Sequence, residues 1–252
     1  MKALAVILAL LLAACGTTPA ADPPPPPQQA KSTQPAGWKA ILIAGDDKEP
    51  AFDNAVDSMA DKLRSFGLPD ANIVELKATA RGPHEANAAN IRRAFVGLNP
   101  AASEGCFVYI TSHGGRGRGL VMKRAAGFLT PGDLGTLLDG TCRGRPTVVI
   151  ASGCFSGSFA EGASLPAPNR TILTAARDDR PSFGCNAQQH YTVFDRCVLE
   201  NLDRGEPWPA MMAKTRACVI EGERKFNVDE PSEPQMSIGQ SVANLLVFAP
   251  GR

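Results

Sequence analysis

The segment Phe107-Val-Tyr-Ile-Thr-Ser-His-Gly-Gly-Arg-Gly117 decides the fold, because its two halves behave differently. Residues 107–111 are apolar and β-branched, which predicts a short buried strand, and Gly114 and the glycines after it cannot continue that strand. His113 is therefore expected at the carboxyl end of a strand, where open α/β sheets bind their ligands. A second run, Thr147-Val-Val-Ile-Ala-Ser-Gly-Cys154, ends in a cysteine in the same way. The two strand ends predict a thiol and an imidazole at one edge of a sheet.

Strands and helices are expected to alternate along the chain. Short apolar runs closed by turn residues predict strands, and apolar residues at helical spacing predict helices. The predicted strands are residues 39–44, 72–76, 107–111, 147–151 and 170–175, and the predicted helices lie around 52–66, 88–98, 130–138, 191–202 and 209–221. The last apolar segment, 243–248, is expected to add a strand or to pack against the end of the sheet. The alternation predicts an α/β fold, a three-layer α/β/α sandwich with a mainly parallel sheet of about six strands.

The amino-terminal residues carry targeting signals. Lys2 and the apolar run 3–12 form a signal-peptide pattern that is too short to span a bilayer. The run ends in Leu12-Ala-Ala-Cys15, which resembles the lipobox of bacterial lipoproteins, the alternative being an ordinary signal with an incidental cysteine. The resemblance implies a signal peptide of residues 1–14 and a lipid on Cys15 that holds the protein in the bacterial envelope. Gly16, where an aspartate would signal inner-membrane retention, favours the outer membrane facing the periplasm.

The rest of the chain divides into a tether and one domain. Residues 15–37 include five consecutive prolines and are expected to be an extended spacer of about 3 Å per residue. Residues 38–252 are enough for one domain with a sizeable core. Without Lys2 the chain has 25 basic and 25 acidic residues, so the charge gives no indication of nucleic-acid binding. Seven cysteines in an exported protein predict disulfides, but their pairing is left open.

The cysteine and the histidine are predicted to form a nucleophilic pair. A cysteine attacks as its thiolate, and an imidazole beside it can take the proton. Because parallel strands lie ~4.8 Å apart, side chains at the ends of neighbouring strands can meet. Gly114 has no side chain, so its N–H and that of Cys154 are expected to bind the oxyanion of a tetrahedral intermediate. Taken alone, Cys154 is more typical of a small buried thiol with a structural role. With His113-Gly114 at the preceding strand end, a catalytic role is the favoured interpretation.

Both motifs resemble those of a known family. Ile110-Thr-Ser-His-Gly114 and Ala151-Ser-Gly-Cys-Phe-Ser-Gly157 are similar, in the same order, to the two motifs of legumain-type cysteine peptidases in the caspase-like clan. Residues 66–74 and 174–177 resemble the family before its second strand and at the end of its fifth, so the resemblance covers most of residues 40–202. It implies a caspase-like fold, a peptide or protein substrate, Cys154 as nucleophile and His113 as acid and base. It implies neither a metal nor an organic cofactor.

The sequence departs from the family at the expected specificity pocket. Legumain and the catalytic subunit of GPI transamidase carry an arginine-histidine pair shortly after the first strand, where this chain has Glu49-Pro-Ala-Phe52. A preference for asparagine before the scissile bond is therefore not implied. Gly153 also stands where the family often has alanine or threonine. Asp179 and Ser182, in the loop after the fifth predicted strand, are candidates for lining the substrate pocket, with a solvated turn as the alternative.

Four other functions are alternatives. A transpeptidase would use the same pair, and a non-catalytic envelope lipoprotein would keep only the peptidase fold. An α/β-hydrolase would use Cys154, Asp179 and His190, with Asp178 as the other candidate acid, but its elbow needs glycines where Ser152 and Ser156 stand. A nucleotide-binding loop at 115–119 lacks the capped helix that phosphate binding requires.

Overall fold

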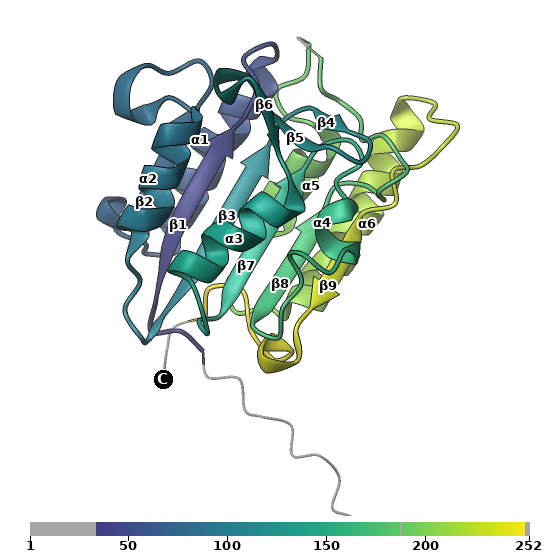
Figure 1. Cartoon of the computed structure of the whole chain (residues 1–252). Helices are drawn as coiled ribbons and strands as arrows, with labels where there is room; N and C mark the ends of the chain where they lie inside the picture. Colours follow the sequence, from purple (N-terminus) through teal and green to yellow (C-terminus); the bar gives the residue numbers. More distant parts are fainter. Residues whose placement is uncertain (1–33, 187, 250–252) are drawn as a thin grey trace, which may run out of the picture. The chain divides into compact units, whose positions relative to one another are not determined.

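A computed structural model describes residues 34–186 and 188–249 (Figure 1). Six strands form the central sheet in the order β2-β1-β3-β7-β8-β9. The first five strands are parallel and the last is antiparallel to its neighbour. Their bounds are Gly37–Ala44 (β1), Ile73–Lys77 (β2), Glu104–Thr111 (β3), Thr147–Ser152 (β7), Arg170–Thr174 (β8) and Gln235–Ile238 (β9). The predicted sheet of about six mainly parallel strands is confirmed.

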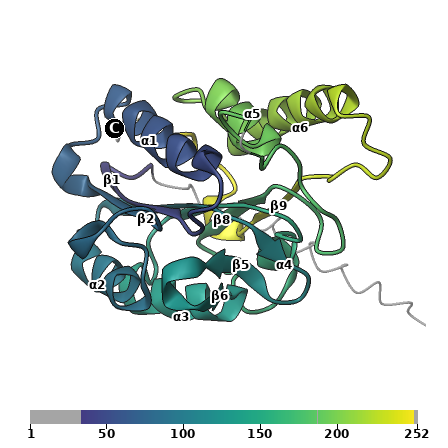
Figure 2. The same cartoon turned by 90° about the horizontal axis from the view of Figure 1, so that it is seen from above.

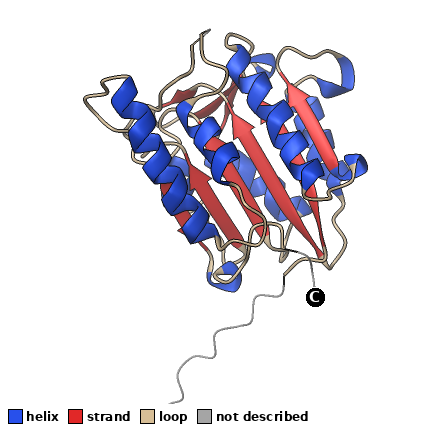
Figure 3. Ribbon diagram, turned by 180° about the vertical axis from the view of Figure 1, so that it is seen from behind, coloured by secondary structure: helices blue, strands red, loops and turns tan. Residues whose placement is uncertain are grey.

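Helices cover both faces of the sheet, as Figure 2 shows from above and Figure 3 from behind. One face packs against α1 (Pro50–Ser65), α5 (Val193–Asn201) and α6 (Trp208–Lys225). The other packs against α2 (Ala88–Leu98), α3 (Pro131–Thr141) and α4 (Ser158–Glu161). Short 3-10 turns lie at Asp70–Asn72, Gly82–His84, Lys123–Ala125 and Gln240–Val242. The three-layer sandwich is therefore also confirmed.

Successive side chains of the buried strands point alternately into two hydrophobic cores, one on each face of the sheet. In β3, Phe107 and Tyr109 enter the core under α1 and α5, whereas Val108 and Ile110 enter the core under α2 and α3. Because successive strand residues point to opposite faces, a strand covered on both faces needs apolar residues at every position. This is why an unbroken apolar run precedes His113.

The predicted helix starts agree with local capping. The side chain of Thr130 accepts a hydrogen bond from the backbone N–H of Asp133, and Asp133 bonds back to the N–H of Thr130. This capping box, with Pro131 in the first turn, satisfies N–H groups that have no partner inside the helix. It starts α3 one residue after Thr130, as predicted.

One region, the glycine-rich segment after His113, differs from expectation, and of the two alternatives for residues 243–248 the structure shows packing at the end of the sheet. The glycine-rich segment after His113 forms a three-stranded antiparallel sheet of β4 (Gly114–Gly115), β5 (Gly119–Met122) and β6 (Gly127–Leu129). Residues 243–248 do not add a strand; they pack at the end of the sheet, where the Phe248 ring lies 5.1 Å from the rings of Trp38 and Phe107 between centroids. The last strand of the sheet is instead β9, whose four residues mix polar and apolar side chains.

Disulfides join Cys106 to Cys142 and Cys197 to Cys218. Cys154 and Cys185 are free thiols. The signal peptide, Cys15 and most of the tether lie outside the described residues. At Gln34, the first described residue, the side-chain amide donates to the carbonyl of Asn244 and accepts from the N–H of Leu246. None of the described helices has the length and apolar character needed to cross a membrane.

Candidate active site

His113 and Cys154 follow neighbouring strands at the same edge of the sheet. Thr111 and Ser152 form the last paired position of β3 and β7, and each lies two residues before a member of the pair. The backbone N–H of Ser112 continues the pairing with a 3.0 Å bond to the carbonyl of Ser152. The parallel register therefore brings both side chains to one place, and both are half-buried. This is the arrangement that the two apolar runs predict.

His113 contacts the first turn of α1 and the strand β5. Its ring meets the Phe52 ring edge-on, with centroids 5.1 Å apart. Its carbonyl accepts a 2.8 Å bond from the N–H of Val121. Among the described residues, no side chain hydrogen-bonds either ring nitrogen, and the Cys154 thiol makes its contacts elsewhere. Nucleophile and base are often farther apart in ligand-free enzymes than in the substrate complex.

The loop after β8 contacts the sulfur of Cys154. The backbone N–H of Ser182 donates to Sγ at 3.3 Å, the Ser182 carbonyl lies 3.5 Å from Sγ, and the Ser182 hydroxyl 3.8 Å. Of the two residues proposed from sequence to line the pocket, Ser182 is thus beside the nucleophile. A peptide bound along this loop would pass the thiol.

Asp179 is tied within its own loop. Its carboxylate pairs with Arg177 at 3.0 Å, and its carbonyl accepts a 2.6 Å bond from the guanidinium of Arg116. Arg177 also pairs with Glu233 at 3.3 Å. The negative charge of Asp179 is therefore balanced by Arg177, and the role of Asp179 in selecting a substrate stays a prediction.

A tight turn presents Cys154. Phe155 has a positive φ of 58°, and its N–H donates to the carbonyl of Arg180 at 2.8 Å. The buried hydroxyl of Ser156 accepts from the N–H groups of Ala175 and Ala176 at 3.0 and 3.2 Å. A Cβ on Gly157 would lie 2.3 Å from the backbone nitrogen of Asp178. The small residues after Cys154 therefore fasten the turn to the end of β8, and left-handed backbone of this kind is often stored at functional sites.

Two glycines allow the close packing of β4 on this turn. A Cβ on Gly114 would lie 1.8 Å from the carbonyl oxygen of Cys154 and 3.0 Å from its nitrogen. A Cβ on Gly153 would lie 2.6 Å from the carbonyl oxygen of Ser112. The Gly114 and Cys154 peptides are thus in contact, and the departure from the family pattern at Gly153 matches a position with no room for a side chain.

Sequence reasoning missed a buried carboxylate beneath the pair. Asp195, on the first turn of α5, is fully buried and accepts hydrogen bonds from the hydroxyls of Tyr109, Thr111 and Thr192 at 2.6, 2.7 and 2.8 Å. Burial raises the pKa of Asp195, while these hydroxyls and that of Ser152 act to lower it. The only signal in the sequence is Thr192-Val-Phe-Asp195, which has the form of an ordinary helix cap.

The other free thiol differs in its surroundings. Burial raises the pKa of Cys185, and the nearby Cys154 raises it further. Cys185 lies in the loop after β8 and not at a strand end. Of the two free cysteines, Cys154 alone combines a strand-end position with a neighbouring histidine in the described chain.

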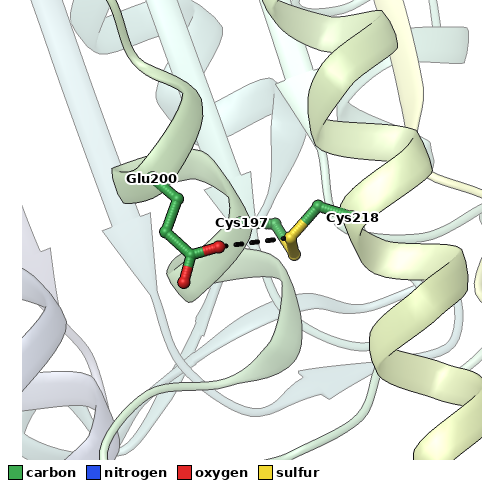
Figure 4. Close-up of side chains that lie close together, drawn as sticks. All are labelled: Cys197, Glu200 and Cys218. Carbon is green, nitrogen blue, oxygen red and sulfur yellow. Dashed lines mark hydrogen bonds between the residues drawn. A yellow bond between two sulfur atoms is a disulfide. The ribbon is translucent and has the colours of Figure 1, made fainter.

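One group of possible metal ligands occurs in the described residues, at Cys197, Glu200 and Cys218 (Figure 4). The two sulfurs form a disulfide, and Glu200 pairs with Arg196 at 3.1 Å. Metals bind cysteine as a thiolate, which the disulfide removes. This group carries no metal site while the bond is intact, and the expectation that no metal takes part stays a prediction.

Comparisons with known proteins agree with this geometry. Residues 86–202 match the model of the Peptidase C13 family, a range that contains both quoted motifs. The crystal structure of caspase-1 from Spodoptera frugiperda is similar with a TM-score of 0.61 over 92% of this chain and 98% of that chain, at 12% identity. At this identity the likeness shows the fold alone, which is caspase-like. No curated protein matches the chain.

The α/β-hydrolase alternative is wrong, because the fold is caspase-like. Its third residue, His190, is exposed and accepts hydrogen bonds from the Asn54 amide, through its ring nitrogen Nδ1 at 3.2 Å and through its carbonyl at 3.1 Å. His190 therefore belongs to the junction of the β8 loop with α1.

Proposed function

We propose that this chain, which is a cysteine peptidase of the legumain and caspase-like type, cleaves peptide bonds with Cys154 as nucleophile and His113 as acid and base. The observation that carries the assignment is the pairing of Thr111 with Ser152, which brings both residues to one sheet edge. A thiol within reach of an imidazole can be activated by proton transfer.

The reaction then follows in two stages. His113 takes the thiol proton, and the Cys154 sulfur attacks the carbonyl carbon of the substrate. The N–H groups of Gly114 and Cys154 bind the resulting oxyanion, and their peptides are already in contact. His113 returns the proton to the leaving amine as the C–N bond breaks, which leaves a thioester. A water, deprotonated by His113, attacks the thioester and restores the thiol while the peptide acid leaves.

An apolar hollow beside Ser182 supports a peptide substrate. Its volume is about 530 Å³, and its lining combines the apolar residues Pro181, Phe183, Phe226 and Val228 with Gly184 and with the polar Asn186, Asn227, Asp229 and Glu230. Because Ser182 contacts the nucleophile, a peptide running along this loop would place a neighbouring side chain in the hollow. An apolar side chain fits that lining, since apolar contacts dominate such pockets.

Transpeptidation shares the thioester and differs only in the group that attacks it. If an amine replaces water, a new peptide bond forms in place of the acid. An assay that contains a peptide with a free amino terminus separates the two, because ligated product appears by mass spectrometry only for the transpeptidase. We favour hydrolysis, since it needs no second peptide site.

The test of the nucleophile is labelling with a panel of peptidyl electrophiles that differ in the residue before the reactive group. Wild type and Cys185→Ala are expected to be labelled, and Cys154→Ala is not. His113→Ala is expected to react much more slowly. Labelling that persists in both Cys154→Ala and His113→Ala would overturn the assignment, and a wild type that no member of the panel labels would favour the non-catalytic alternative. The preferred member of the panel reports the residue before the bond.

We also propose that Cys15 carries the lipid and holds the enzyme in the bacterial envelope. The lipobox-like residues 12–15 and the proline-rich spacer support this placement. A Cys15→Ser variant is expected to leave the membrane pellet, or to retain its signal peptide, while wild type stays in the pellet and gains the mass of acyl chains. Wild-type protein of unmodified mass in the soluble periplasmic fraction would contradict the anchor.

A further inference from the structure

Asp195 connects three segments that meet at the active site. Its carboxylate accepts a 2.7 Å hydrogen bond from Thr111, the last residue of β3, and Thr111 is the register partner of Ser152 at the end of β7. Thr192, just before α5, donates to the same carboxylate at 2.8 Å and accepts from the Asp195 N–H at 3.0 Å. All four residues are at most 3% exposed.

Each segment leads directly to a residue of the proposed reaction. Two residues after Thr111 comes His113, and two residues after Ser152 comes Cys154. At the start of α5, the N–H of Val193 donates to the carbonyl of Phe183 at 3.0 Å, which fixes the loop beside Ser182. One carboxylate therefore fixes the backbone from which His113, Cys154 and the loop beside Ser182 extend.

A stabilising role alone does not account for a carboxylate here. Burying a carboxylate costs free energy, and hydroxyl donors offset that cost only when each is well placed. An apolar residue of similar size would fill the space without this demand. The carboxylate instead holds hydroxyls from separate elements at fixed distances, which a nonpolar contact cannot do.

We propose that Asp195 is a positioning residue of the peptidase, holding the ends of β3 and β7 and the start of α5 so that His113, Cys154 and Ser182 meet in reactive geometry. This proposal rests on the proposed function. Asp195 touches none of the reacting atoms. Its effect is on alignment, and a misplacement of about 1 Å can cost on the order of 10²-fold in rate.

The test compares two hydroxyls that donate to Asp195, one close to His113 along β3 (Thr111) and one farther from it (Tyr109). Thr111→Val keeps the shape and loses the hydroxyl, so kcat is expected to fall by about 10- to 100-fold at nearly unchanged KM. Thr111→Ser keeps the hydroxyl and is expected to recover most of kcat. Tyr109→Phe removes the 2.6 Å bond four residues before His113, and it is expected to lower the melting temperature with little change in kcat. Asp195→Asn should resemble Thr111→Val.

A second readout does not depend on the peptide substrate. In a Cys185→Ala background, the rate at which iodoacetamide alkylates Cys154 reports the state of the thiol, and this rate should change in Thr111→Val and Asp195→Asn but not in Tyr109→Phe. Wild-type kcat and alkylation rates in both Thr111→Val and Asp195→Asn would overturn the positioning role, as would equal losses in Tyr109→Phe and Thr111→Val. Turnover of peptide by Cys154→Ala would overturn the proposed function itself. The Asp195 variants test only the positioning role, so the two failures can be told apart.

Discussion

Replacing His113 by alanine is expected to lower kcat/KM for a peptide substrate by about 10²- to 10⁴-fold, the usual contribution of a general acid and base. His113 acts twice in the proposed reaction, because it activates the thiol and then protonates the leaving amine. Both effects arise in the transition state, so kcat should carry the loss and KM should change little. The half-buried ring packs on one aromatic ring of the described chain, that of Phe52, so the variant is expected to fold.

The matched control is His190→Ala. His190 is exposed and bonded to Asn54, so its removal should leave kcat/KM within about 2-fold of wild type, as for surface changes in general. The measurement is turnover of a fluorogenic peptide chosen from the labelling panel, with the melting temperatures of both variants recorded. If His190→Ala were the inactive variant and His113→Ala the active one, the pair at the sheet edge would be the wrong site.

The parts of the fold that could be predicted from sequence are those fixed by local pattern. Strands covered on both faces leave unbroken apolar runs such as 107–111, and helices leave apolar residues at helical spacing. Thr130 and Asp133 mark the start of α3 because a capping box needs only neighbouring residues. The family inferred from the two motifs agrees with the family model that matches residues 86–202, and each motif is a strand followed closely by a candidate reactive residue.

What the sequence could not show depends on contacts between distant residues. The strands β4 to β6 have two to four residues and contain glycines, so no periodicity reveals them. β9 is an edge strand of only four residues that mix polar and apolar side chains, whereas the apolar segment 243–248 packs around Phe248 without forming a strand. The disulfide partners were undecided for the same reason.

The candidate site divides in the same way. His113 and Cys154 are predicted from the ends of two strands, and the parallel register places both at one edge of the sheet. Asp195 did not stand out, since Thr192 and Asp195 together have the form of a helix cap and do form one. Only the structure shows that the carboxylate of this cap also reaches Tyr109 and Thr111 in β3.

Gly114→Ala is expected to abolish most of the activity without removing any group that takes part in the reaction. The new Cβ would lie 1.8 Å from the carbonyl oxygen of Cys154, and that oxygen belongs to the backbone, so no side chain can turn away. Either β4 or the turn that carries Cys154 must move by roughly 1 Å, because a densely packed interior leaves no free space for it. A shift of about 1 Å at the reacting groups is expected to cost on the order of 10²-fold in kcat.

The control is Gly97→Ala in α2. A Cβ there meets nothing within 4 Å, and alanine favours a helix over glycine by roughly 0.5–1 kcal/mol, so stability should rise and turnover should not change. The rate of Cys154 alkylation separates the two causes of loss in Gly114→Ala: a displaced nucleophile changes that rate, whereas a displaced oxyanion donor lowers peptide turnover alone. Wild-type turnover in Gly114→Ala would mean that the turn moves aside freely, and the contact between the Gly114 and Cys154 peptides would then not hold the catalytic geometry.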